Sequence, residues 1–213
     1  MKKVKMMFVL LFLMFTLLGC GTVNNEIYNK SYNVGEIDIS DFENLVTAVI
    51  EKTEGSVLGV SNYSNSLFDD SVSYGSGFVY KTIAIMKDGT EKSYDEVLDS
   101  DQVKTFKYYL VTNRHVVEGD SQTLKVYFGN EDLEVDAELV AYDDYVDLAV
   151  ITFEHTTIIK PLELANSDNL KKGNFAIAIG SPSGYEFYGS ATFGIISHPK
   201  RYIEEDLNSD GVS

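Results

Sequence analysis

The sequence is short of several residue types, and each shortage narrows the range of functions. Cys20 is the single cysteine among 213 residues, so an exported form of the chain would have no intrachain disulfide. With no second cysteine and no paired histidines at ligand spacing, the sequence predicts no transition-metal site and no cofactor. Only 3 prolines and 16 glycines argue against a fibrous or low-complexity protein.

Basic residues are also scarce. The chain has 17 lysines and arginines against 33 aspartates and glutamates, for a formal net charge of −16. So acidic a surface repels nucleic-acid phosphates and anionic membrane surfaces, and we expect neither as a direct partner. At 213 residues, of which 44% are hydrophobic, the chain can bury a good core in one large or two small domains.

The N-terminal apolar run is too short for an ordinary membrane-spanning helix. It covers Met6–Leu18, follows three lysines and precedes Gly19 and Cys20. A basic start before a short apolar stretch predicts a secretion signal over residues 1–19. Leu17-Leu18-Gly19-Cys20 resembles a bacterial lipobox, which implies a lipid on Cys20 and a protein anchored to the extracytoplasmic face of the cell membrane. A signal without lipidation and an uncleaved anchor are the alternatives.

A tether and a helix are predicted next. Residues 20–39 are polar and rich in asparagine, which is typical of a tether. Ser40 and Glu43 have capping-box spacing, and apolar residues follow at helical spacing as far as Gly55. We expect a short amphipathic helix over residues 40–54, with its apolar stripe packed on the first barrel; binding of a partner is the alternative.

From Ser56 onward the patterns favour strands. Six are predicted before residue 155, at Ser56–Ser61, Tyr74–Ile85, Lys107–Thr112, Thr123–Phe128, Glu134–Tyr142 and Leu148–Phe153. Six strands suffice to close a small barrel, which we assign to residues 55–165. Gly75 and Gly77 mark a place where the backbone bends or approaches another strand closely, and the polar stretch Lys87–Lys104 is predicted to be a surface loop.

Residues 166–213 supply fewer strands than a barrel needs. Two are predicted, at Asn174–Ile179 and Tyr188–Ser197. Two or three strands cannot close on themselves, so we expect the incomplete start of a second barrel, from a fragment or a truncated reading frame. Asp206–Gly211 has the oxygen-rich spacing of the first half of a calcium loop, although a plain acidic turn explains it as well.

A histidine and an aspartate stand where strands meet turns. His115 follows the β-prone run that ends in Thr112-Asn113, and Asp147 precedes the apolar run Leu148–Ile151. Imidazole titrates near neutrality and can act as a general base, while a carboxylate can fix its tautomer. Asp143 and Asp144 are rivals for the orienting role, but Asp147 abuts the apolar strand. The other two histidines, His155 and His198, are predicted to be ordinary surface residues.

Several motifs in a fixed order carry a family resemblance. They are Gly75-Ser76-Gly77-Phe78-Val79, Thr112-Asn113-Arg114-His115-Val116-Val117, Asp147-Leu148-Ala149-Val150, Asn166-Ser167-Asp168, Ala178-Ile179-Gly180-Ser181-Pro182-Ser183-Gly184 and Thr192-Phe193-Gly194-Ile195-Ile196-Ser197. Together they cover about residues 55 to 201, and the chain closely resembles the HtrA/Deg family of trypsin-like serine proteases.

The resemblance implies an all-β fold, a chymotrypsin-type double barrel with one short N-terminal helix. It also implies that His115 is the general base and Asp147 its orienting partner. The implied substrates are unfolded or damaged extracytoplasmic proteins, and a homo-oligomer is compatible with the family.

One departure from the family concerns the nucleophile. In the family it lies in a Gly-Asn-Ser-Gly-Gly-type turn beyond the strand that ends at Ser197. The seven serines after Asp147 are Ser167, Ser181, Ser183, Ser190, Ser197, Ser209 and Ser213, and none precedes a glycine pair. The leading hypothesis is a serine endopeptidase without its nucleophile segment, inactive in this form. The alternatives are a catalytically dead lipoprotein that uses the scaffold for binding, and a non-functional remnant.

Overall fold

The computed structural model describes residues 39–64, 71–97, 102–119, 122–129 and 133–200. The predicted signal peptide, the predicted lipidation site Cys20 and most of the predicted tether lie outside these ranges, as does Asp206–Gly211.

The predicted amphipathic helix is present as α2 (Ile39–Thr53), and the 3-10 turn η2 (Glu54–Ser56) follows it. No residue of α2 is buried, and Leu45 and Val49 are 61% and 41% exposed. The expectation that the apolar stripe packs on the barrel is therefore wrong for these two side chains. Helical periodicity identifies the apolar face of a helix but not the surface that covers it. No helix within the described ranges has both the length and the apolar character to cross a membrane.

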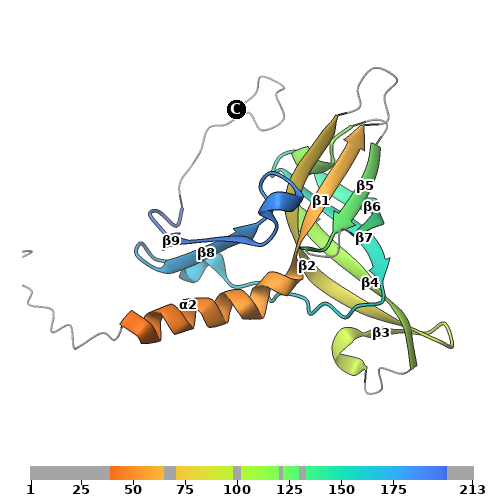
Figure 1. Ribbon diagram of the computed structural model, residues 1–213, viewed down its shortest axis with the longest axis horizontal. Coiled ribbons are helices and arrows are strands. Elements are labelled where there is room, and N and C mark those ends of the chain that lie inside the picture. Colours follow the sequence, from red (N-terminus) through yellow and green to blue (C-terminus); the bar gives the residue numbers. More distant parts are fainter. Residues whose placement is uncertain (1–38, 65–70, 98–101, 120–121, 130–132, 201–213) are drawn as a thin grey trace, which may run out of the picture. The chain divides into compact units, whose positions relative to one another are not determined.

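Six antiparallel strands close into a barrel (Figure 1). Their order around the barrel is β1-β5-β6-β7-β4-β2, and pairing of β1 with β2 completes the ring. Their bounds are β1 (Val57–Ser64), β2 (Val72–Met86), β4 (Val103–Thr112), β5 (Gln122–Tyr127), β6 (Glu134–Asp143) and β7 (Leu148–His155). Each strand predicted for this region is confirmed, and differences are confined to the ends, where assignments ordinarily vary.

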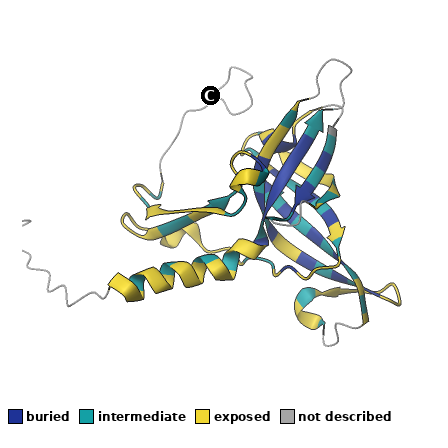
Figure 2. Ribbon diagram, viewed as in Figure 1, coloured by how far each residue is buried: buried dark blue, intermediate teal, exposed yellow. Residues whose placement is uncertain are grey.

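Alternation of side chains explains why these segments form strands with one buried face. In β4, Phe106, Tyr108 and Leu110 are buried while the residues between them are partly exposed. In β7, Ala149, Ile151 and Phe153 do the same. Successive strand side chains point to opposite faces, so β4 and β7 send every second side chain into the barrel. The core lies inside the barrel (Figure 2), and each fully buried aliphatic or aromatic side chain contributes about 1.5–3 kcal/mol.

Two glycines allow close packing inside the barrel. A Cβ on Gly77 would lie 1.9 Å from Leu110 Cδ2 and 2.8 Å from the carbonyl oxygen of Val111. A Cβ on Gly75 would lie 2.6 Å from Val116. Neither position has room for a larger residue. The predicted close approach of another strand is confirmed at Gly77, whereas Gly75 packs against the side chain of Val116.

The polar insertion between β2 and β4 is more ordered than predicted. It contains the short strand β3 (Glu91–Ser93), which pairs with β2, and the 3-10 turn η3 (Tyr94–Glu96). Asp88 accepts a hydrogen bond from the backbone N–H of Thr90 at 2.9 Å, and Gly89 has φ of 86°. This Asp-Gly turn reverses the chain, so that β3 can pair antiparallel with β2.

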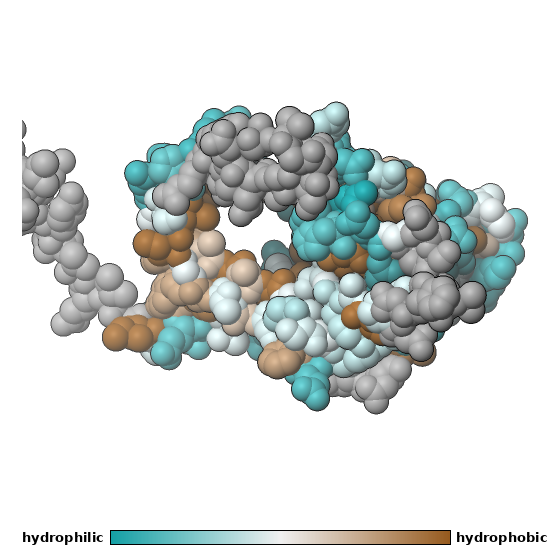
Figure 3. All heavy atoms as spheres, turned by 90° about the horizontal axis from the view of Figure 1, so that it is seen from above, coloured by the Kyte–Doolittle hydropathy of each residue, from teal (hydrophilic) through white to brown (hydrophobic). Residues whose placement is uncertain are grey.

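The remaining strands form a separate two-stranded sheet of β8 (Phe175–Gly180) and β9 (Ser190–Ile195), with η8 (Tyr185–Phe187) between them. Apolar side chains lie at the surface over these strands (Figure 3); Phe175, Phe193 and Ile195 are 65%, 45% and 60% exposed. The described fold is thus mostly β, with one closed barrel and two strands of a second sheet. It is consistent with a trypsin-like double barrel in which the second barrel is incomplete.

Candidate active site

The pairing of β4 with β7 brings His115 and Asp147 to the same end of the barrel. Thr112 at the end of β4 lies opposite Ala149 near the start of β7. His115 lies within the 3-10 turn η5 (Arg114–Val117), three residues after Thr112. Asp147 precedes Ala149 by two residues. Antiparallel strands place the end of one beside the start of the next, so the strand register alone predicts their proximity.

Buried contacts hold η5 on the barrel. Val116 and Val117 are 5% and 2% exposed, and the side-chain amide of Asn62 on β1 donates to the carbonyls of Val116 and Glu118, each at 3.0 Å. His115, between these anchored residues and β4, therefore has a fixed backbone.

Two hydrogen bonds join His115 to the carboxylate of Asp147. The ring nitrogen Nδ1 lies 2.8 Å from Oδ2, and the backbone N–H of His115 donates to Oδ1 at 2.9 Å. The two side chains are 64% and 13% exposed. With Nδ1 against a carboxylate, the proton of the neutral imidazole resides on Nδ1, and Nε2 is left as the basic nitrogen.

Asp147 is held in its ionised form. Burial raises the pKa of its carboxyl, but the bonds from the backbone and ring of His115 and from Asn113 outweigh burial and lower that pKa below the ordinary value. A carboxylate that stays charged at neutral pH can stabilise an imidazolium formed beside it.

The rival aspartates have other partners. Asp143 accepts the backbone N–H groups of Tyr145 and Val146 at 2.8 and 3.3 Å, which closes the turn between β6 and β7. Asp144 pairs with Nε of Arg114. Asp143 is exposed and Asp144 is half-buried, and the structure brings Asp147 rather than either rival to His115.

Sequence reasoning missed Asn113 and Arg114. The amide of Asn113 donates to Asp147 Oδ2 at 3.0 Å and to its carbonyl oxygen at 3.1 Å. Arg114 pairs with Glu118 at 2.6 Å as well as with Asp144. Both residues adjoin His115 in sequence, but nothing in the local pattern indicates which way their side chains turn.

The other two histidines lie elsewhere. His155, at the end of β7, is half-buried and stacks on Phe128 with ring centroids 4.7 Å apart, so it is less exposed than predicted. It lines a cavity of about 610 Å³, to which Leu58, Ile159 and Tyr188 also contribute and which includes neither His115 nor Asp147. His198 is exposed, as predicted.

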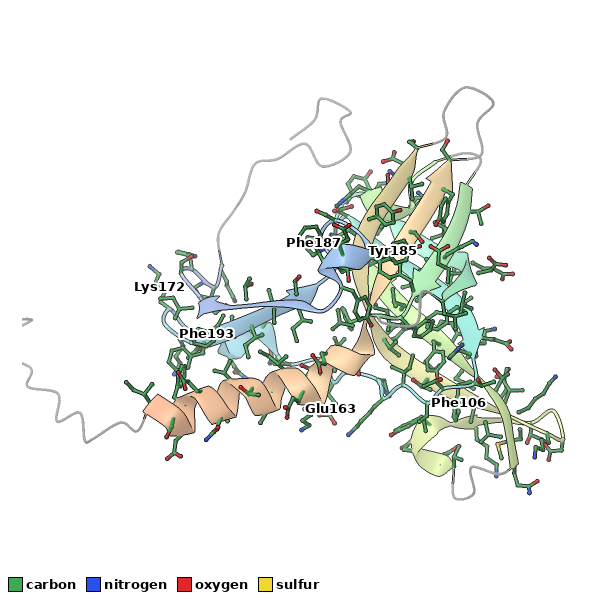
Figure 4. The ribbon with its side chains drawn as sticks, in the orientation of Figure 1. Phe106, Glu163, Lys172, Tyr185, Phe187 and Phe193 are labelled. Atoms are coloured by element: carbon green, nitrogen blue, oxygen red, sulfur yellow. The ribbon has the colours of Figure 1, made fainter. Side chains whose placement is uncertain are left out.

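A second polar cluster ties η8 to the barrel. Glu134 Oε1 accepts hydrogen bonds from Ser61 Oγ at 2.5 Å, from Tyr63 OH at 2.8 Å and from Tyr185 OH, and Lys125 Nζ lies 3.6 Å from Oε2. Figure 4 shows Tyr185 on η8 beside the barrel strands. We call these five residues the Glu134 cluster.

The Glu134 cluster contains a half-buried carboxylate that is ionised. Burial raises the pKa of Glu134, yet the three hydroxyl donors and Lys125 outweigh it and lower that pKa below the usual range. Burial and the adjacent carboxylate raise the pKa of Tyr185, which stays a hydroxyl donor. The cluster is therefore a set of charge-assisted hydrogen bonds, the stronger kind.

The described part of the site has no arrangement of residues for a metal ion, and its polar groups are a base and a carboxylate. No group of three or more His, Cys, Asp or Glu residues there is arranged to hold a metal ion. No serine of the described segments is hydrogen bonded to His115. The geometry supplies a base and its orienting carboxylate, two of the three groups of a Ser-His-Asp triad.

Comparison with known proteins finds that similar sequences belong to serine proteases. The family model of the trypsin-like peptidase domain matches residues 75–211. The serine protease Do-like HtrA of Lactococcus lactis subsp. cremoris is 32% identical over 191 residues, which cover 85% of this chain and 42% of that protein. The serine protease Do-like HtrB of Bacillus subtilis is 32% identical over 192 residues, which cover 90% of this chain and 38% of that protein.

A protein of Escherichia coli is also similar. The periplasmic pH-dependent serine endoprotease DegQ of Escherichia coli is 34% identical over 110 residues, covering 52% of this chain and 23% of that protein. The chain thus spans less than half the length of the curated relatives it matches. The chain belongs to the trypsin-like peptidase family, and within it to the HtrA/Do serine proteases.

Proposed function

We propose that this chain supplies the general base and the orienting carboxylate of an HtrA-type serine endopeptidase. The observation that carries the proposal is the contact of 2.8 Å between Nδ1 of His115 and Oδ2 of Asp147. In this role Nε2 of His115 takes the proton of a serine hydroxyl as that oxygen attacks the peptide carbonyl, and later returns it to the leaving amine. Asp147 keeps the imidazole in the required tautomer and stabilises its charged form.

The nucleophile does not lie within residues 1–213 in this proposal. The sequence has no pair of adjacent glycines, and so no Gly-x-Ser-Gly-Gly turn to present a serine and an oxyanion hole of backbone N–H groups. We therefore expect residues 1–213 alone not to hydrolyse peptides at a useful rate. A form that continues through such a turn would have the complete triad.

The proposed setting is the extracytoplasmic face of the cell membrane. A basic and apolar N-terminus followed by Cys20 supports export and lipid anchoring, and the name of the DegQ relative places that protein in the periplasm. In this setting the substrates are unfolded or damaged proteins, which fit a quality-control protease. Assembly into a homo-oligomer is compatible with this proposal.

A serine-directed fluorophosphonate tests the proposed chemistry. It labels only a serine whose hydroxyl is activated by a base and flanked by an oxyanion hole. Residues 1–213 should remain unlabelled, and a form extended through the Gly-x-Ser-Gly-Gly turn should be labelled. His115→Ala in the extended form should abolish labelling.

Two results would contradict the proposal. Labelling of residues 1–213 would place a nucleophile inside this chain, and labelling unaffected by His115→Ala would remove the base. The reading frame after codon 213 separates the alternatives, since an in-frame nucleophile turn supports the protease and a stop codon favours a binding lipoprotein or a remnant.

A further inference from the structure

Asp147 has an unusual backbone conformation. Its φ is 49°, and it is the one non-glycine residue with positive φ among those that the structure describes. This left-handed region is uncommon for non-glycine residues, although aspartate enters it more readily than most. The hydrogen bonds around Asp147 then set where its carboxylate points.

The side chain of Asn113 makes two of those contacts. Its single amide nitrogen donates to the backbone carbonyl oxygen of Asp147 at 3.1 Å and to its carboxylate Oδ2 at 3.0 Å. The amide thus ties the backbone of Asp147 to its own side chain and restricts both the backbone turn and the carboxylate rotamer.

Asn113 does not have the role that its position suggests. It stands at the N-cap of η5, where an asparagine usually accepts a hydrogen bond from the backbone N–H two or three residues on. Its side chain makes no such bond. The N–H of His115 donates instead to Oδ1 of Asp147 at 2.9 Å. Asn113 therefore donates to Asp147, and Asp147 in turn accepts the backbone N–H of His115.

The two donors to Oδ2 are the ring of His115 and the amide of Asn113, at 2.8 and 3.0 Å. We propose that Asn113 is a positioning residue that orients Asp147 and so keeps the proton of neutral His115 on Nδ1. This inference rests on the proposed function of the His115–Asp147 pair. Asn113 does not itself touch the reacting atoms in this account.

The role can be separated from a contribution to folding. The side chain of Asn113 is exposed, so its removal opens no cavity. The bond from the N–H of Arg114 to the carbonyl of Asp147, at 3.2 Å, remains in any Asn113 variant. We therefore expect Asn113→Ala to fold, with the change confined to the carboxylate and the imidazole.

The tautomer of His115 is the direct readout. Long-range proton–nitrogen NMR spectra of the 213-residue chain report which ring nitrogen carries the proton, at about pH 9, where imidazoles are neutral. The wild-type chain should show His115 protonated on Nδ1. Asn113→Ala should shift His115 toward the Nε2-protonated form that free imidazole favours. Asn113→Asp has the same shape but places a second carboxylate beside Oδ2 of Asp147. This variant should shift the His115 tautomer further toward the Nε2-protonated form.

A matched control is Asn166→Ala. Asn166 is another exposed asparagine, and its side chain accepts the backbone N–H of Asp168 at 2.9 Å. This variant should leave the His115 tautomer unchanged. In a form with the nucleophile turn, Asn113→Ala should lower kcat about tenfold, the effect of one lost hydrogen bond, while Asn166→Ala should not.

Asp147→Asn distinguishes failure of this inference from failure of the proposed function. If Asp147→Asn changes the His115 tautomer and both Asn113 variants leave it unchanged, the positioning role is refuted and the catalytic pair stands. If Asp147→Asn also leaves the tautomer unchanged, the pair itself is refuted.

Discussion

Replacing Glu134 with alanine is expected to lower the free energy of unfolding by about 3 kcal/mol. Glu134 Oε1 accepts three hydroxyl donors, and one of them, Ser61, is fully buried. The alanine variant would leave this serine without its acceptor, and an orphaned buried hydroxyl costs about 1–3 kcal/mol. It would also remove the charge-assisted bonds to Tyr63 and Tyr185. Glu134→Gln keeps an acceptor oxygen and should cost about half as much.

Thermal and urea unfolding, followed by circular dichroism, measure this loss. For a chain of this size about 3 kcal/mol corresponds to a fall in Tm of about 6–12 °C. The control is Glu138→Ala on the same strand, because Glu138 is exposed and such a change ordinarily costs under about 0.5 kcal/mol. If the free energy of unfolding of Glu134→Ala lies within about 0.5 kcal/mol of the wild-type value, the Glu134 cluster does not stabilise the fold and the prediction is wrong.

Three further predictions concern the barrel. The hydroxyl donors and Lys125 lower the pKa of Glu134 in the folded state. Its stabilising effect is therefore complete above the unfolded pKa of about 4.3 and is lost as the pH falls through the lowered folded pKa. The difference in free energy of unfolding between wild type and Glu134→Gln, measured by urea titration, should narrow as the pH falls below about 4.3. Gly77→Ala should lower the free energy of unfolding by about 1–3 kcal/mol in the same assay. Gly55→Ala should leave it nearly unchanged, because a Cβ at that position meets nothing within 4 Å. Tyr108→Phe should cost about 1–3 kcal/mol, because this buried hydroxyl donates to the carbonyl of Thr157 and accepts the N–H of Ile159; equal Tm values would contradict this.

Much of the barrel could be predicted because its strands carry local signals. Alternating buried residues such as Phe106, Tyr108 and Leu110 mark β4 as a strand with one inner face. Once β4 and β7 are paired, the positions of His115 and Asp147 at strand ends place them together. Local pattern and tertiary contact agree at this site.

Contacts between distant segments could not be predicted. Ser61 and Tyr185 meet through Glu134, although no periodicity links residues so far apart in sequence. For α2 the apolar pattern is clear in the sequence, but the pattern does not indicate which surface covers that face of the helix. Asn113 adjoins His115 in sequence, but only the structure shows that its amide donates to Asp147.

The most direct test of the central claim is the kcat/KM of Asp147→Asn for an unfolded protein substrate, in a form that carries the nucleophile turn. If Asp147 orients His115, the asparagine leaves the geometry intact but favours the wrong tautomer, and kcat/KM should fall about 10⁴-fold with no loss of Tm beyond about 4 °C. A variant that keeps activity within about tenfold of wild type would show that the carboxylate beside His115 is not part of the catalytic machinery.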